Sequence, residues 1–506
     1  MTAIELGRTV AVVGTGTMGQ GIAQVALVAG HPVRLYDAAE GRAAEAARAI
    51  GARLDRLVEK GRLDAAGRDA ARARLHPATS TAELADSALV IEAILEQLDA
   101  KQKLFVELES VVPDDCLLAT NTSSLSVTAV AGALRLPGRF VGLHFFNPAP
   151  LLPLVEVVQG HATDPAAADR AQATVAAWGK TPVRSADTPG FIVNRVARPF
   201  YAEAFRLLEE RVADPATLDA VLRESGGFAM GPFELTDLIG QDVNEAVTRS
   251  VYDSFFQDPK FRPSLAQRRL VEAGLLGRKS GRGWYDYADG AERPVPRTEE
   301  PAPPPGEVAV HAKPAGPAAV LREMIEEAGI KVTRDRTPGM SEGFIRLPGG
   351  ACLALTDGYP ATTYPDEPFI RFDLALDYRA ATRIALAPSH RITPEQTREA
   401  VGLFQALGKR VSVVADVPGM IVARTVAMIV DFAVDAAARG VASPEDIDTA
   451  MRLGVNYPGG PFEWTERLGA HWLWDLLDTM HHQSPGGRYA PSWALRRRAD
   501  IERQVL

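Results

Sequence analysis

Two stretches of this 506-residue chain carry the same landmarks at one constant spacing. Gly190 ends an Asp-Thr-Pro-Gly segment and Gly419 ends an Asp-Val-Pro-Gly segment, while Gly231 and Gly460 each begin a Gly-Pro-Phe-Glu segment. The residue numbers of both pairs differ by the same amount, because 419 − 190 equals 460 − 231. A single offset without insertions indicates a duplicated structural unit. We therefore expect one domain to occur twice.

The duplicated segment has the periodicity of helices. From about residue 192 to residue 273 the pattern is helical and strand signals are few. We expect an all-α domain at 188–290 and its second copy at 416–506. Prolines cluster in 291–317, a composition that stays extended and predicts a linker. Residues 318–415 combine short apolar runs with helical patterns, which predicts a smaller, degenerate α/β unit.

The N-terminal segment has the pattern of a βαβ unit. Residues 9–13 and 32–36 are apolar, β-rich runs, and the stretch 19–29 between them is helical in pattern. Further short strands alternate with helical patterns in the segment that follows. This alternation predicts a Rossmann-type α/β fold with a doubly wound, parallel sheet, which we assign to residues 1–187.

A glycine-rich turn joins the first predicted strand to the helix. It follows a Gly-x-Gly-x-x-Gly pattern and includes Gly14, Gly16, Thr17, Met18 and Gly19. Such glycines permit a tight turn and let a dinucleotide pyrophosphate approach the helix N-terminus. Asp37 ends the second strand, where a carboxylate would bind the ribose hydroxyls and repel a 2′-phosphate, which favours NAD over NADP. The alternative role for Asp37 is a helix N-cap.

Composition limits the classes of partner. The net charge is −9, so no basic surface is expected for nucleic acid or for an anionic membrane. No run of 18 apolar residues marks a membrane span. Two cysteines, Cys116 and Cys352, cannot build a disulfide framework or a cysteine-based zinc site. We expect a cytoplasmic protein that acts on a small molecule without a metal.

One histidine and one glutamate are candidate catalytic groups. His144 ends an apolar run at the carboxyl edge of the predicted sheet, where ligands bind in doubly wound folds. Glu156 lies within an apolar run and requires a partner, because an unpaired buried carboxylate costs several kcal/mol. Alcohol oxidation needs a base for the hydroxyl proton, which a histidine fixed by a carboxylate can supply. The alternative is a purely structural pair.

Two further polar positions lie at expected element ends. Ser123 is in an Asn-Thr-Ser-Ser segment, and Asn194 is in a Phe-Ile-Val-Asn-Arg segment. Capping of helices and turns is the common use of such residues at these places. Their role therefore stays open at this point.

Eight strings of the chain, in order, carry a family resemblance. They are GTGTMGQGIA, EAILE, NTSSLSVT, GLHFFNPAP, LVEVV, DTPGFIVNR, GPFEL and GRKSGRGWY. Together they resemble the 3-hydroxyacyl-CoA dehydrogenases over about residues 8–287, and the second copy resembles that family's helical domain alone. The resemblance implies NAD as cofactor and oxidation of (S)-3-hydroxyacyl-CoA to 3-oxoacyl-CoA, with a cleft between the Rossmann and helical domains.

The resemblance also implies roles for individual residues. His144 and Glu156 become the catalytic pair, and Ser123 and Asn194 become groups that position the substrate. Lys60 becomes a contact of the CoA group. The further contacts to NAD that the resemblance implies are Glu92, Gln97, Asn147 and Lys279.

The second copy lacks the implied machinery. Ala423 stands where the first copy has Asn194, although Arg424 matches Arg195. No histidine strand, glycine loop or acid corresponding to Glu156 precedes it. We expect the second half to be catalytically inactive and to form an intrachain pseudo-dimer with the first helical domain, the alternative being a homo-oligomer.

The substrate depends on features beyond the common motifs. A dehydrogenase followed by a proline-rich linker and a second helical copy is similar, within this family, to the 3-hydroxyadipyl-CoA dehydrogenases of bacterial phenylacetate catabolism. A 3-hydroxybutyryl-CoA dehydrogenase and a non-catalytic NAD-binding relative are the alternatives. Arg195 and Arg198 are candidates for binding a distal carboxylate, although surface or interdomain salt bridges would explain them as well.

Overall fold

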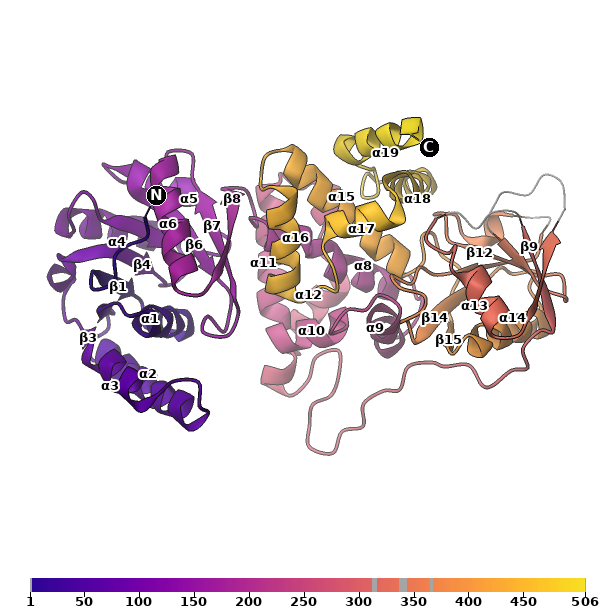
Figure 1. Cartoon of the computed structure of the whole chain (residues 1–506), viewed down its shortest axis with the longest axis horizontal. Coiled ribbons are helices and arrows are strands. Elements are labelled where there is room, and N and C mark those ends of the chain that lie inside the picture. The colour runs from indigo at the N-terminus through magenta and orange to yellow at the C-terminus, as the bar shows by residue number, and fades with distance from the viewer. Residues whose placement is uncertain (1, 312–315, 336–343, 365–366, 506) are drawn as a thin grey trace. The chain divides into compact units, whose positions relative to one another are not determined.

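The computed structural model describes residues 2–311, 316–335, 344–364 and 367–505 (Figure 1). The chain divides into two compact units. The first unit comprises Met1–Arg195 and Arg439–Val455, and the second comprises Val196–Ala438 and Asn456–Leu506. None of the helices in these described ranges is long and apolar enough to cross a membrane.

The first unit is built on an eight-stranded sheet with the order β3-β2-β1-β4-β5-β6-β7-β8. The strands are β1 Thr9–Val13, β2 Val33–Tyr36, β3 Leu75–Pro77, β4 Ser87–Glu92, β5 Leu117–Thr120, β6 Phe140–Phe145, β7 Leu154–Gln159 and β8 Thr181–Ala186. The helices are α1 Thr17–Ala29, α2 Arg42–Glu59, α3 Ala65–Ala73, α4 Leu98–Val111, α5 Val127–Ala131 and α6 Pro165–Ala177. The predicted Rossmann-type fold is confirmed.

The sheet has a core on each face because its strands alternate their side chains. Val10 and Val12 of β1 pack into a cluster with α1, α2 and α6. Ala11 and Val13 pack into a second cluster with α4 and α5. All residues of β1, β4 and β6 are buried, which explains their continuous apolar sequences.

The sheet differs from the prediction in one respect, because it is not wholly parallel. Strand β7 pairs with β6 antiparallel and with β8 in parallel. The residues between β6 and β7 therefore reverse the chain at the edge where β6 ends. This reversal brings Glu156 directly opposite His144 in the strand register.

The second unit contains a seven-stranded sheet with the order β10-β9-β11-β12-β13-β14-β15. Its strands are β9 Glu307–His311, β10 Lys331–Asp335, β11 Phe344–Arg346, β12 Cys352–Leu355, β13 Phe369–Phe372, β14 Arg383–Pro388 and β15 Arg410–Val413. Helices α13 Leu321–Glu327 and α14 Pro394–Ala406 pack on it. The predicted smaller α/β unit is thereby present.

The predicted linker at 291–317 needs a correction. Strand β9 lies within it, and Val308 of that strand is buried in the sheet core. Earlier in the range, the backbone N–H of Glu299 donates to the carbonyl of Val411 in β15. The proline-rich segment is therefore attached to the smaller α/β unit at this point. Residues 312–315 of the linker, and 336–343 and 365–366 of the α/β unit, lie outside the described residues.

Two sets of helices follow the two sheets. The first set is α7 Val193–Val196, α8 Arg198–Glu209, α9 Pro215–Glu224, α10 Pro232–Ile239, α11 Gln241–Ser254 and α12 Leu265–Glu272. The second set is α15 Val422–Ala438, α16 Pro444–Val455, α17 Pro461–Leu468, α18 Ala470–Gln483 and α19 Trp493–Val505. Helices α10 and α17, and likewise α11 and α18, match at both ends with the offset that relates Gly190 to Gly419. The duplication is therefore confirmed, and we call this spacing the repeat offset.

The duplication extends further towards the N-terminus than the sequence indicated. Strands β7 and β14 have equal lengths and begin one repeat offset apart, and so do helices α6 and α14. Strand β13 likewise begins one repeat offset after β6. The smaller α/β unit thus repeats the last part of the Rossmann sheet but not its glycine loop.

The two copies exchange one helix between the sheets. Helix α16 packs on β7 and β8 within the first unit, where the N–H of Ala186 donates to the carbonyl of Val441 at 2.7 Å. Helix α9 packs on β14 within the second unit, where the N–H of Leu376 donates to the carbonyl of Ser225 at 3.0 Å. Each sheet is thus covered by the helix that belongs to the other copy.

Candidate active site

The glycine loop lies between β1 and α1, and its glycines have different tasks. Gly14 has φ +97°, and a Cβ there would lie 2.5 Å from the carbonyl oxygen of Ala93. A Cβ on Gly19 would lie 1.9 Å from the carbonyl oxygen of Gly14. A Cβ on Gly16 would meet nothing within 4 Å. Gly14 and Gly19 therefore allow the turn to pack, while Gly16 keeps its outer side open.

The start of α1 fits the phosphates of a dinucleotide. Gly16 is the N-cap of α1, no side chain caps it, and the first turn contains no acidic residue. Uncapped N–H groups at a helix N-terminus bind anions such as phosphate. Thr17 is exposed at this end, and Met18 is half-buried against the core. The loop therefore fits the pyrophosphate of NAD.

Asp37 lies just beyond β2 and faces the same loop. One of its carboxylate oxygens accepts from the backbone N–H of Thr15 at 2.9 Å and from the hydroxyl of Thr15 at 2.6 Å. The other accepts from the N–H of Ala39 at 3.0 Å. Burial raises the pKa of Asp37, but these hydrogen bonds outweigh it and hold that pKa below its usual value. The residue is not the N-cap of α2, because Gly41 takes that position.

His144 and Glu156 form a buried pair across β6 and β7. Nδ1 of His144 lies 2.6 Å from Oε2 of Glu156, and Glu156 is fully buried. Oε1 of Glu156 accepts from the N–H groups of Ile192 and Val193 at 3.0 and 2.9 Å. With both oxygens acting as acceptors, Nδ1 of His144 carries the proton and Nε2 is left as the accepting nitrogen. The arrangement can take a proton from an alcohol.

The segment after β5 and the start of α7 meet beside this pair. The side-chain amide of Asn194 donates to the carbonyl of Ser123 at 3.4 Å, and both residues are half-buried. Oδ1 of Asn121 accepts from the N–H of Phe145 at 2.9 Å, next to the histidine. Ser123, Asn194 and the His144–Glu156 pair are therefore brought together within the first unit.

Glu96 organises this segment, and the sequence did not single it out. Its Oε1 accepts from the N–H of Ser123 at 2.9 Å, from the N–H of Ser124 at 3.1 Å and from the hydroxyl of Thr122 at 2.6 Å. Lys101 forms an ion pair with it at 3.2 Å. The available signal was that Glu96, the second acid of EAILE, comes shortly after a strand that ends at the first acid, Glu92.

Comparison with family models assigns both halves of the chain. The model described as the 3-hydroxyacyl-CoA dehydrogenase NAD-binding domain matches residues 9–188. The model of the C-terminal domain matches 190–287 and again 419–504. The model described as the 3-hydroxybutyryl-CoA dehydrogenase reduced Rossmann-fold domain matches 353–418. The chain belongs to the 3-hydroxyacyl-CoA dehydrogenase family.

Similar proteins fall into two length classes. The 3-hydroxyadipyl-CoA dehydrogenase of Escherichia coli (strain K12) is 44% identical over 495 residues, which cover 98% of each chain. A crystal structure described as 3-hydroxybutyryl-CoA dehydrogenase from Escherichia coli K12 has a TM-score of 0.90 and 43% identity, covering 99% of this chain and 100% of that one. The probable 3-hydroxybutyryl-CoA dehydrogenase of Deinococcus radiodurans is 40% identical over 276 residues, 54% of this chain and 99% of its own. The shorter class corresponds to little more than half of this chain.

One implied cofactor contact of this 3-hydroxyacyl-CoA dehydrogenase is wrong. The side chain of Glu92 is fully buried, and its Oε1 accepts from Nζ of Lys101 at 2.6 Å and from the N–H of Ile94 at 2.7 Å. Its Oε2 accepts from the hydroxyl of Thr120 at 2.7 Å. A carboxylate enclosed in this way has a structural role and is not available to NAD.

The remaining implied contacts lie on the surface. Gln97 is exposed at the N-cap of α4, and Asn147 is exposed just after β6. Lys60 is exposed at the C-terminal end of α2. Lys279 belongs to the second unit, where it donates to Oδ2 of Asp242 at 2.7 Å. The contacts of these four residues with the cofactor or the substrate therefore stay predictions.

The second half of the dehydrogenase has an acid where the first half has its histidine. The repeat offset makes Asp373 the counterpart of His144, and Ala385 the counterpart of Glu156. Asp373 is fully buried, and its Oδ2 accepts from the N–H groups of Ile421 and Val422 at 3.1 and 2.8 Å. Glu156 accepts from the equivalent N–H groups in the first half. As expected, no acid occupies the position that corresponds to Glu156, which is Ala385. Asp373, at the position of the histidine, instead accepts the hydrogen bonds that Glu156 accepts in the first half.

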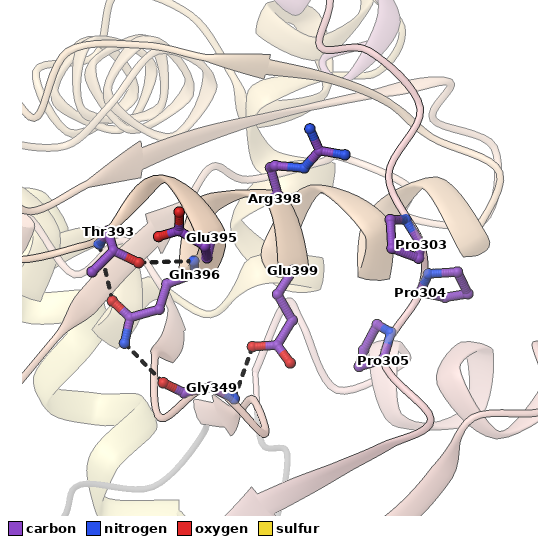
Figure 2. Close-up of a pocket in the computed structure, with 9 residues that line it drawn as sticks. All are labelled: Pro303, Pro304, Pro305, Gly349, Thr393, Glu395, Gln396, Arg398 and Glu399. Atoms are coloured by element: carbon purple, nitrogen blue, oxygen red, sulfur yellow. Dashed lines mark hydrogen bonds between the residues drawn. The ribbon is translucent and has the colours of Figure 1, made fainter.

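The second unit has a separate cavity of about 620 Å³ between prolines 303–305 and α14. Figure 2 shows the capping box of α14, in which the Thr393 hydroxyl accepts from the N–H of Gln396, and the Gln396 side chain accepts from the N–H of Thr393. Glu395 and Glu399 line the same cavity. A capped helix end flanked by carboxylates does not offer a phosphate site of the glycine-loop kind. In the described part of the chain, no group of His, Cys, Asp or Glu side chains is placed to hold a metal ion.

Proposed function

We propose that this 3-hydroxyacyl-CoA dehydrogenase uses His144 as its catalytic base and that its substrate is 3-hydroxyadipyl-CoA, oxidised to the 3-oxoacyl thioester in phenylacetate catabolism. The observation that supports the chemistry is the 2.6 Å contact between His144 and Glu156, next to Ser123 and Asn194. The observation that supports the substrate is the likeness to the 3-hydroxyadipyl-CoA dehydrogenase of Escherichia coli over 98% of both chains.

The proton of the substrate hydroxyl passes to Nε2 of His144. Glu156 holds the Nδ1–H and stabilises the imidazolium that forms, as a buried carboxylate does in other His–acid pairs. Glu156 keeps its own position because the backbone of Ile192 and Val193 donates to its second oxygen. The base is thus oriented before the substrate binds, which lowers the reorganisation needed in the transition state.

The cofactor residues on this proposal are those of the glycine loop together with Asp37. When bound there, NAD supplies the hydride acceptor. The uncapped start of α1 holds the pyrophosphate, and the ionised Asp37 holds the adenosine ribose and disfavours a 2′-phosphate. Ser123 and Asn194 position the hydroxyl and the thioester carbonyl, and Lys60 contacts the CoA group.

A second candidate substrate is 3-hydroxybutyryl-CoA, which the names of several relatives favour. The two substrates differ in chain length and in the distal carboxylate. Steady-state kcat/KM values for both thioesters with NAD decide between them. A preference for 3-hydroxybutyryl-CoA would contradict the proposal. No turnover of acetoacetyl-CoA with NADH, despite saturable NADH binding, would favour a non-catalytic relative instead.

The inactive half fits the role of a built-in partner. In the second unit, α8 of the first copy packs against α15 of the second copy. Glu203 on α8 is fully buried and pairs with Arg488 and Arg424 of the second copy. We infer an intrachain pseudo-dimer, and hence an enzyme that sediments as a single chain. Sedimentation as a stable homodimer would contradict this inference. The cytoplasmic location expected from the sequence remains a separate proposal.

A further inference from the structure

One buried arginine of the second unit has no acidic partner. Arg198 begins α8 and is 6% exposed. Its Nη1 donates to the hydroxyl of Thr248 at 3.0 Å, and its guanidinium carbon lies 5.0 Å from the ring centre of Tyr201. Its Nε has no hydrogen-bond partner, and no carboxylate of the described residues pairs with it. A buried cation without a counter-ion is costly, so this one calls for an explanation.

A tyrosine of the same environment is also unsatisfied. Tyr457 is 6% exposed, and its hydroxyl has no hydrogen-bond partner within the described residues. Its ring lies 5.7 Å from that of Phe200, which in turn lies 5.7 Å from that of Tyr201. Burial raises the pKa of Tyr457 well above its usual value, although the charge of Arg198 opposes this rise. The phenol therefore stays protonated and can donate a hydrogen bond.

The duplication shows that packing alone does not require these polar groups. The repeat offset gives the counterparts of Arg198, Tyr201 and Thr248 as Ala427, Val430 and Leu477, and that of Tyr457 as Phe228. All four counterparts are apolar and buried. The same helical framework thus packs with apolar residues at every one of these positions. These polar residues occur only around α8 of the first copy, the helix that follows Asn194, and not at the matching positions around α15.

We propose that Arg198, with Tyr201 and Tyr457, binds the distal carboxylate of a dicarboxylic acyl thioester. This inference rests on the proposed function and specifies its substrate class. A guanidinium fork and phenol hydroxyls are the donors that recognise a carboxylate by charge-assisted hydrogen bonds. Arg198 is four residues after Asn194 in the sequence, so the Cα atoms of the two residues are at most about 14 Å apart. A neutral acyl chain would leave the buried cation uncompensated, so the site also disfavours the wrong substrate.

The test compares 3-hydroxyadipyl-CoA with 3-hydroxyhexanoyl-CoA, which has the same acyl length and no carboxylate. Arg198→Met is expected to lower the ratio of the two kcat/KM values about 100-fold, within the range for truncating one partner of a buried charge pair. Arg206→Met is the same substitution on the same helix, at a half-buried arginine whose charged neighbours are Glu203, Arg424 and Arg488. It is the matched control and is expected to leave the ratio within about threefold, because none of these neighbours belongs to the proposed carboxylate site. Tyr457→Phe removes only one hydroxyl and is expected to lower the ratio about tenfold.

The outcomes separate this inference from the proposed function. A wild-type enzyme without preference for the dicarboxylic thioester would overturn both. A wild-type preference that survives Arg198→Met and Tyr457→Phe would overturn the inference alone. An equal loss with both thioesters would show that Arg198 has only a structural role, and would also overturn it. If Arg198→Met does not fold, the ratio measured for Tyr457→Phe decides.

Discussion

Glu156 in the first half of the chain and Asp373 in the second half both accept hydrogen bonds from the backbone where a helix begins. Glu156 reaches that backbone from β7, and its second oxygen is left for His144. Asp373 reaches it from the position that corresponds to His144, and Ala385 occupies the position of Glu156. In both halves, therefore, a buried carboxylate stabilises the backbone at the start of a helix. The histidine is what distinguishes the half that we propose to be catalytic.

The largest effect is expected from His144→Gln. The glutamine cannot accept and hold the hydroxyl proton, so kcat should fall about 1,000-fold, while the Kd for NADH changes by no more than a few fold. Stopped-flow turnover and NADH fluorescence titration measure the two quantities. Asp373→Asn is the matched control, since it alters the equivalent position of the other half and should keep kcat. Near-normal turnover of the His144 variant would show that the base is another group.

The next effect concerns the contact between the copies. Glu203 is fully buried between two arginines, and although burial raises its pKa, the arginine charges hold that pKa below its usual value. Glu203→Ala removes the carboxylate that pairs with Arg488 and leaves Arg424 with its ion pair to Glu210 alone. It should lower the free energy of unfolding by about 3–5 kcal/mol. Glu272→Ala breaks an exposed helical ion pair and should cost less than about 0.5 kcal/mol. Similar urea midpoints for the two variants would contradict the proposed role of the second copy.

The smallest effect is the contribution of the buried Asp373, in the second half, to the pH dependence of stability. Burial raises the pKa of Asp373 to about 6, whereas an unfolded aspartate titrates near about 3.9. The folded protein therefore binds the proton more tightly, so this contribution to stability is present below about pH 4 and is lost as the pH rises to about 6. Its size is at most about 3 kcal/mol.

Urea denaturation between pH 4 and 7 measures this contribution. Asp373→Asn does not titrate, so its free energy of unfolding should fall less steeply over this range than that of the wild type. Parallel pH profiles for the two proteins would mean that Asp373 is not held in the protonation state described here.

Local sequence patterns predicted much of the fold. Periodicity among neighbouring residues predicted the βαβ unit and the glycine loop. The constant offset between two segments predicted the helical copies. The direction of β7 did not follow, because it depends on how the chain turns after His144. Strand β9 was hidden by the prolines around it, since a proline-rich composition predicts an extended chain whether or not a sheet receives it.

The site was predictable at the level of residue types and less so at the level of single contacts. His144 and Glu156 were identified because a buried carboxylate needs a hydrogen-bonding partner and a catalytic histidine needs an acid to orient it. Glu92 was predicted as a cofactor contact only because the family resemblance implied it, and the tertiary structure buries it against Lys101 at the end of β4. Asp373 was missed because it corresponds in sequence to His144, although it accepts the backbone hydrogen bonds that Glu156 accepts in the first half.

One chain should carry one active site, in the half with the glycine loop and the His144–Glu156 pair. Isothermal titration of the whole chain with NADH measures the number of cofactor sites, because the second sheet repeats only strands that follow the cofactor loop. We expect one NADH bound per chain. A stoichiometry of two would contradict it, since the second half would then hold a cofactor without a glycine loop.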